Sequence, residues 1–213
     1  MRLRKQAWIV EAIQEYSDLI VNLNESVSAD NWNQIFGKSG EIYVEVGTGK
    51  GRFITEMAAL HPDKLYVGVE AQHDIIYFAA RKAREKGLKN VRFLLMDGKL
   101  LTELFAPGSI AGLFINFCDP WPKKRHSKRR LTHRSFFPVY SGLLQMGAPL
   151  CFKTDNRDLF AFSLNEFADC NLKLKHISLD LHKEEWDENV ETEYEAKFSA
   201  LGQPIYRCEV YFS

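Results

Sequence analysis

EIYVEVGTGKG, at residues 41–51, is an apolar strand that runs directly into a glycine-rich turn. The segment that follows, 52–60, has Phe53, Met57 and Leu60 on one side, which predicts a helix. Glycines in such a turn let the backbone approach a ligand where a Cβ atom would collide. A strand, a glycine-rich turn and a helix in this order favour an open α/β sheet that binds a nucleoside-like ligand.

Apolar strands and helical segments alternate along the rest of the chain. We expect strands at 41–46, 65–69, 91–96, 113–117 and 150–153, and helices at 7–23, 52–60, 75–86 and 159–167. Alternating stretches at 176–181 and 206–212 are typical of a closing antiparallel pair. The pattern predicts an α/β fold with a mainly parallel central sheet, an antiparallel strand pair at its end, and helices on both faces. We expect one domain over residues 1–213, with 1–40 as an extension packed on it or flexible beside it.

Composition excludes several classes of protein. The chain has 213 residues, 46% hydrophobic and 26% charged, and no apolar run near the roughly 20 residues that a membrane helix needs. Its four cysteines form no CxxC pair, which argues against a zinc site or a disulfide framework. We therefore expect a cytoplasmic protein without a metal and without membrane contact, as a monomer or a homodimer.

Charge is unevenly distributed although the formal net charge is +0. Seven basic residues and no acid lie between Lys123 and Arg134, and seven acids and no base lie between Glu184 and Glu195. Blocks of this kind carry more information than the sum. The basic tract favours contact with phosphates, although a solvated charged face is the commoner explanation of such a run.

One carboxylate lies inside the first expected strand, and two more lie where the second and third expected strands end. The glycine spacing is G-x-G-x-G with Arg52 in sixth place, so neither the dinucleotide fingerprint nor a phosphate-binding P-loop is present. Glu70 is at the distance expected for an acid that binds ribose hydroxyls, and Asp97 is placed to accept from an adenine amino group. Glu45, inside the first strand, is placed to meet a cationic amino group. An adenosine pocket beside a site for a charged amino-acid tail predicts S-adenosylmethionine.

Four further segments are more specific. They are DPWPKKRHSKRRL at 119–131, FKTDNRDLF at 152–160, TEYEAKF at 192–198 and ALGQPIYR at 200–207. With EVGTGKG at 45–51 they resemble the bacterial tRNA (guanine-N7-)-methyltransferase family over nearly the whole chain. The resemblance implies a Rossmann-like class I methyltransferase that moves a methyl group from S-adenosylmethionine to N7 of guanosine 46 in the tRNA variable loop. It leaves S-adenosylhomocysteine as product. One departure is Cys118, where relatives commonly carry Pro or Ser.

The resemblance also implies roles for individual residues. Asp119 falls on the catalytic aspartate. Cofactor contacts fall on Glu45, Glu70, Asp97 and Asp119, joined by Gly47 and Gly49 of the glycine-rich turn. Substrate contacts fall on Lys123, Asp155, Thr192, Glu193, Tyr194 and Glu195, and RNA contacts on Arg125, His126, Ser127, Lys128, Arg129 and Arg130.

Alternatives are open at several of these positions. Asp119 before a proline also fits a turn-initiating residue. Thr192-x-x-Glu195 fits a helix capping box, with Gly202 as the stop of a short helix, and capping and guanine contact are compatible. Cys118 has two interpretations, a catalytic nucleophile or a small half-buried thiol, and the second is favoured. Rival functions are another RNA or protein nitrogen methyltransferase, or an RNA-binding relative without activity.

Overall fold

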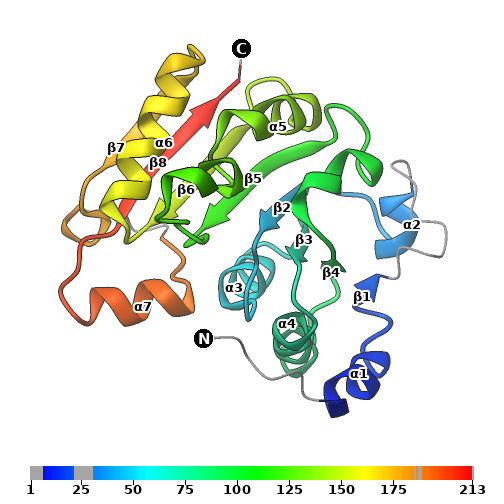
Figure 1. The fold of residues 1–213 in the computed structure, drawn as a ribbon. Coiled ribbons are helices and arrows are strands. Elements are labelled where there is room, and N and C mark those ends of the chain that lie inside the picture. Colours follow the sequence, from blue (N-terminus) through cyan, green and yellow to red (C-terminus); the bar gives the residue numbers. More distant parts are fainter. Residues whose placement is uncertain (1–6, 22–30, 185, 187–188, 213) are drawn as a thin grey trace. The chain divides into compact units, whose positions relative to one another are not determined.

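The computed structural model of the chain describes residues 7–21, 31–184, 186 and 189–212 (Figure 1). The chain divides into two units, Met1–Phe105 and Ala106–Ser213, and each is considered by itself. A single domain over 1–213 stays a prediction. Much of the expected extension, residues 1–6 and 22–30, lies outside the described part of the chain.

Four parallel strands form the sheet of the first unit. They are β1 (Ile20–Val21), β2 (Ile42–Val46), β3 (Leu65–Glu70) and β4 (Val91–Leu95), in the order β1-β4-β3-β2. Val44 lies opposite Val67 in the register, and both side chains are fully buried. Buried β-branched residues pack well on a pleated surface covered on both faces, which is why these strands are nearly continuous apolar runs.

Helices cover both faces of this sheet (Figure 1). Phe93 of β4 lies in an apolar cluster with α3 (Arg52–Leu60) and α4 (His73–Glu85), and α1 (Ala7–Gln14) packs on α4. The next residue along β4, Arg92, points to the other face, where its guanidinium lies 4.9 Å from the ring centroid of Phe36 in α2 (Trp32–Phe36). Trp32 fixes α2 by stacking on Phe105 at 4.9 Å and donating its indole N–H to the Leu104 carbonyl at 2.8 Å.

The second unit combines a parallel and an antiparallel part. Its strands are β5 (Ile110–Asn116), β6 (Pro149–Thr154), β7 (Lys173–Ser178) and β8 (Tyr206–Tyr211), in the order β5-β6-β8-β7. β5 pairs with β6 in parallel, and β8 is antiparallel to both β6 and β7. The parallel sheets with an antiparallel pair at the end confirm the predicted strand arrangement.

Aromatic side chains hold the helices of the second unit on its sheet. The ring of Phe160 in α6 (Arg157–Asp169) stacks on Phe152 of β6 and on Tyr206 of β8, at 6.1 and 5.2 Å. Phe137 of α5 (Phe137–Leu143) packs against Phe167 at 5.5 Å. The remaining elements are α7 (Glu193–Ser199) and the short 3-10 helices η1 (Gly98–Glu103), η2 (Lys124–Arg129), η3 (Arg134–Phe136) and η4 (Leu181–Lys183).

Three boundary predictions are wrong by three residues or more. The strand expected at 113–117 is β5, which begins at Ile110, and the other two errors have a clear structural cause. The helix expected at 7–23 ends at Gln14, because Leu19 and Ile20 turn into the core beside Phe93 and the chain continues as β1. The strand expected at 176–181 is β7, which begins at Lys173 and ends at Ser178. His176 has a φ of +48° and the register shifts between Lys175 and Ser178, so this irregularity displaces the alternation that the sequence pattern relied on.

Gly51 gives a test of the packing beneath the glycine-rich turn. Its φ is +78°, and a Cβ atom there would lie 2.6 Å from the Cβ of Ala79 in α4. We expect Gly51→Ala to lower the free energy of unfolding by about 2–4 kcal/mol, because a left-handed backbone and overpacking add. Urea denaturation followed by circular dichroism measures it.

Gly87→Ala is the matched control. This glycine also has a positive φ, +66°, but a Cβ atom would meet nothing within 4 Å. Only the conformational penalty of about 1 kcal/mol is expected. Equal losses for the two variants would contradict the packing argument.

Candidate functional site

Glu70 joins two loops at the carboxyl ends of β2 and β3. Its Oε2 atom accepts a hydrogen bond from the Gly49 N–H at 3.1 Å, and its Oε1 atom accepts one from the Gln72 N–H at 3.0 Å. Gly47 and Gly49 have φ values of +80° and +57°, which a residue with a Cβ atom rarely adopts. The buried carboxylate therefore fixes a turn that needs glycine to form.

The same edge fits an adenosine-type cofactor. Glu45 is 2% exposed, and its Oε2 atom accepts from the Thr48 hydroxyl at 2.6 Å. Asp97 is exposed and begins η1, with its Oδ1 atom accepting from the Lys99 N–H at 3.0 Å. A Cβ atom at Gly49 would meet nothing within 4 Å, so this side of the turn is open to a ligand. Three carboxylates thus lie at or near the carboxyl ends of three neighbouring parallel strands, at the edge where such sheets bind ligands.

A braced loop after β5 carries Asp119. The Arg130 guanidinium donates to the carbonyls of Pro120 and Trp121 at 2.9 and 3.1 Å, and it lies 4.2 Å from the ring centroid of Phe162 in α6. Trp121 has a φ of +42°, a strained conformation that this brace holds. Asp119 is exposed, and no hydrogen bond to its carboxylate is found in the described part of the chain. The loop therefore presents a carboxylate that the fold itself does not use.

Part of the basic tract stabilises the structure. Arg134 binds Glu166 and Asp169 at 2.9 and 2.7 Å, and this contact holds the pKa of Glu166 below its usual value. The Arg129 guanidinium lies 4.9 Å from the Trp121 ring centroid. The exposed cations of the tract for which no ion pair with an acid is found among the described residues are Lys123, Lys124, Arg125, Lys128 and Arg129. His126 and Ser127, which were predicted with them, are half-buried.

The predicted capping box is confirmed. Thr192 precedes α7, its hydroxyl accepts from the Glu195 N–H at 2.9 Å, and the Glu195 carboxylate bonds back to the Thr192 N–H at 3.4 Å. The helix is assigned to Ser199, and Gly202 closes it as expected: its φ is +70°, its N–H donates to the Ser199 carbonyl at 2.9 Å, and the Gln203 N–H donates to the Phe198 carbonyl at 3.0 Å. Tyr194 is 57% exposed and Glu193 is half-buried, whereas Glu195 is fully buried.

Lys153 of β6 is a residue that the sequence reasoning missed. Its side chain is buried, and its Nζ atom lies 2.6 Å from Oε2 of Glu195. The signal was present, because a lysine between Phe152 and Thr154 in a buried strand needs an internal partner. Asp155, the next residue but one, is half-buried, and burial raises the pKa of its carboxyl group.

The thiol interpretation of Cys118 agrees with its surroundings. Burial, with a smaller contribution from the negative charge of Asp119, raises the pKa of Cys118 to about 12. The thiol is then protonated at neutral pH, and a protonated thiol is a poor nucleophile. Burial also raises the pKa values of Cys151 and Cys208 to about 12.

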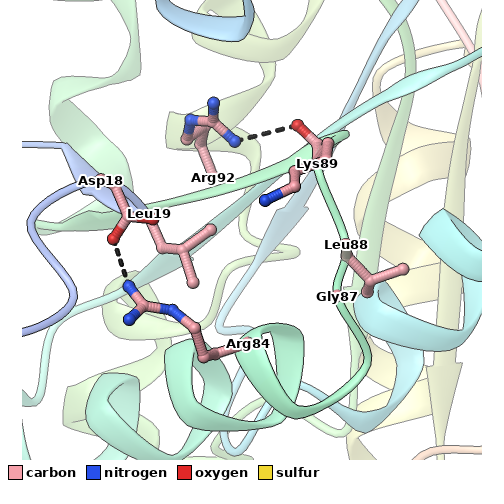
Figure 2. A pocket seen from close by; sticks show the side chains of 7 residues that line it. All are labelled: Asp18, Leu19, Arg84, Gly87, Leu88, Lys89 and Arg92. Carbon is pink, nitrogen blue, oxygen red and sulfur yellow. Dashed lines mark hydrogen bonds and ion pairs between the residues drawn. The ribbon is translucent and has the colours of Figure 1, made fainter.

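A hollow of about 180 Å³ lies at the opposite, amino ends of β1 and β4 (Figure 2). Arg84, Lys89 and Arg92 line it, with Asp18 facing Arg84. Arg84 pairs with Asp18, and the Arg92 guanidinium donates to the carbonyls of Lys89, Val91 and Ile35. These two arginines hold the loops together, so the hollow has few donors left for a ligand.

The described residues contain neither a cluster of metal ligands nor a helix that could span a membrane. No group of three or more His, Cys, Asp or Glu side chains there is arranged to hold a metal ion. No helix in the same ranges combines the length and the apolar character needed to cross a bilayer.

Solved structures with the same fold are methyltransferases. An antibiotic-related methyltransferase aligns with 88% of this chain and 94% of its own, with a TM-score of 0.64 and 18% identity. A 16S rRNA methyltransferase aligns with 89% of this chain and 96% of its own, with a TM-score of 0.65 and 13% identity. At this identity the likeness concerns the fold alone, and it confirms the predicted Rossmann-like class I methyltransferase fold.

Sequence relatives are much closer. A family model described as a putative methyltransferase matches residues 39–208. The tRNA (guanine-N(7)-)-methyltransferase of Bacillus subtilis (strain 168) is 45% identical over 210 residues, covering 99% of this chain and 98% of its own. The enzyme of the same name from Geobacillus sp. (strain WCH70) is 46% identical, covering 99% and 95%. With matches of this length and identity, and with the glycine-rich turn and the Asp119 loop in place, the chain belongs to the tRNA (guanine-N7-)-methyltransferase family.

Proposed function

We propose that this protein transfers a methyl group from S-adenosylmethionine to N7 of guanine in tRNA, at guanosine 46 of the variable loop. The observation that carries the proposal is the loop after β5, which presents an unused carboxylate and exposed cations on one braced segment of a family member. The partner is then tRNA, and the reaction belongs to the cytoplasm. A monomer or a homodimer stays a prediction.

Residues of the first unit are proposed to hold the cofactor. Glu45 offers a buried carboxylate to the cationic amino group of the methionine tail. The open side of Gly49 accommodates the backbone approach, and Glu70 and Asp97 are the proposed acceptors for the ribose hydroxyls and the adenine amino group. Gly47 shapes the turn and Asp119 is the remaining proposed contact. When bound, S-adenosylmethionine supplies the methyl group on a sulfonium centre.

Asp119 is proposed as the catalytic residue. Guanine N7 carries a lone pair and no proton, so no base is needed to activate it. The purine gains positive charge as the methyl group arrives, and a carboxylate facing the ring stabilises that charge. The two prolines of the loop and the Arg130 brace keep Asp119 in place before the reaction, which favours an in-line geometry.

Substrate contacts are proposed at Lys123, Asp155 and the start of α7. Carboxylates that accept from the Watson–Crick edge select guanine, and a base within folded RNA must leave its stack to reach them. Glu193 and Tyr194 are accessible for this role, whereas the enclosed Glu195 supports the segment from within, beside Thr192.

The basic tract is proposed to bind RNA phosphates. Its members are Arg125, His126, Ser127, Lys128, Arg129 and Arg130. Of these, Arg130 is engaged with the loop carbonyls, so its main contribution is to hold the loop. Arg125, Lys128 and Arg129, together with Lys123 and Lys124, supply the exposed charge.

A methylation assay tests the proposed function. Unmodified tRNA is incubated with the purified chain and methyl-labelled S-adenosylmethionine. We expect label in 7-methylguanosine after nucleoside analysis, and chemical cleavage at 7-methylguanosine at position 46. Label in another nucleoside, or tRNA binding without label, would favour one of the rival functions.

Asp119→Asn tests the electrostatic role. The amide keeps the shape and loses the charge, so we expect kcat to fall about 10²–10³-fold. The dissociation constant for tRNA is expected to stay within about twofold, because the exposed side chain supports no contact of the fold. Asp158→Asn, at an exposed position in the first turn of α6, is the control and should keep its activity. Near-normal turnover of Asp119→Asn would contradict the role.

Salt dependence tests the basic tract. Each phosphate contact releases counterions, so removing one should reduce the slope of log K against log salt by about 0.7–0.9. We expect this for Lys124→Gln and for Lys128→Gln, measured by filter binding between low and moderate salt. Lys173→Gln, an exposed lysine on β7, is the control. Identical slopes for all variants would remove the tract from the binding surface.

A further inference from the structure

Lys153 makes an unusual set of contacts for a lysine in a strand. Its ammonium lies 2.6 Å from Oε2 of Glu195, 2.9 Å from the Val190 carbonyl and 3.1 Å from Oδ1 of Asn189. Three acceptors match the three N–H bonds of an ammonium group. The whole stretch that leads into α7 is therefore gathered around one side chain of β6.

Glu195 is equally enclosed. Its side chain is 0% exposed, and its Oε1 atom accepts from Nδ2 of Asn189 at 2.6 Å and lies 3.2 Å from Nε2 of His182. Taking two charges out of water costs about as much as their attraction returns, so a buried pair is a weak source of stability. In some proteins a buried pair serves to select one arrangement of the segments that it joins, and this is the role inferred for the pair below.

The backbone of Lys153 holds a second segment. Its carbonyl accepts from the Phe117 N–H at 2.9 Å, where the loop that carries Asp119 begins. Phe117 has a φ of +50°, which is strained for an aromatic residue, so this hydrogen bond helps to fix the direction in which the loop leaves β5. The side chain and the main chain of one residue thus hold both proposed substrate segments.

The two segments meet in a pair of aromatic rings. The Phe117 and Tyr194 rings are nearly parallel, at 17°, with centroids 6.5 Å apart, and Tyr194 in turn faces Phe198 at 6.3 Å. Tyr194 directly precedes Glu195, so the buried pair sets the place of this exposed ring. A shift of either segment would separate the rings and displace the Asp119 loop from the start of α7.

We propose that Lys153 is a positioning residue for methyl transfer, acting through Glu195 on α7 and through Phe117 on the Asp119 loop. The inference rests on the proposed function. It assigns Glu195 to holding the substrate segment, and it predicts that Lys153 and Glu195 act as one unit on kcat while tRNA affinity depends on the exposed cations.

A double-mutant cycle on the full chain tests this. The variants are Lys153→Met, Glu195→Gln and their combination, with kcat measured per folded molecule at saturating tRNA and S-adenosylmethionine. We expect each single variant to lose at least tenfold in kcat, the double variant to lose no more than the worse single one, and the dissociation constant for tRNA to change less than threefold.

Two results would overturn the proposal. One is a kcat loss in the double variant that equals the product of the single losses, because the residues would then act separately. The other is a normal kcat in the double variant. Since Lys153→Met alone leaves a buried carboxylate unpaired and can prevent folding, Lys153→Arg supplies a further arm. Lys153→Arg keeps the positive charge, so its kcat should lie within fivefold of the wild-type value. A kcat as low as that of Lys153→Met would count against the proposal.

Proteolysis gives a readout that does not depend on methylation. A protease that cleaves after glutamate should cut at Glu191 and Glu193 at least tenfold faster in Lys153→Met or the double variant than in wild type. Lys173→Met, at an exposed lysine of β7, should leave the rate unchanged. Equal rates in all variants would refute the positioning role. A wild-type chain that forms no 7-methylguanosine but shows the proteolysis difference would refute the proposed function instead.

Discussion

Charge buried at the carboxyl end of a strand must find its partners within the protein, and much of the site follows from this constraint. In the first unit, Glu70 meets it by accepting from the amides of Gly49 and Gln72, which fixes two loops at once. In the second unit, Lys153 and Glu195 meet it by pairing with each other. Each solution costs desolvation and yields a loop with one conformation. The loops proposed to carry the site residues are thus held by charged side chains that are buried from solvent.

Much of the fold was predictable because local patterns and tertiary structure agree in it. The run at 41–51 predicted β2, its turn and α3, and the Thr192–Glu195 spacing predicted the cap of α7. The sequence was misleading where one side chain decided between two local structures. Leu19 and Ile20 continue a helical period, but burial against Phe93 makes them a strand. No sequence pattern predicts the register shift around His176, because the shift depends on how β7 pairs with β8.

The sequence predicted which segments carry the candidate site residues, but it predicted the burial and the partners of the individual side chains less well. Motif resemblance selected Glu195 as a substrate contact, whereas its full burial assigns it to support. Lys153 was missed because a lysine in a strand is normally expected to point outward to solvent. The basic tract shows a related limit. A charge count treats Arg130 and Arg134 like Lys124, yet the first two are held by carbonyls and by Glu166. Counting charge in a sequence overstates the charge that is available to a polynucleotide.

The high pKa values of three cysteines have a consequence for the chemistry of the chain's surroundings. A thiolate, and not a thiol, attacks peroxides and disulfides, and burial leaves Cys118, Cys151 and Cys208 almost entirely as thiols at neutral pH. Cys118 is adjacent to Asp119, so an oxidised sulfur there would add bulk and charge beside the carboxylate that is proposed to act in catalysis. Because the Cys118 sulfur stays protonated, oxidants in the surroundings react with it slowly, and we expect tRNA methylation to depend little on the redox state.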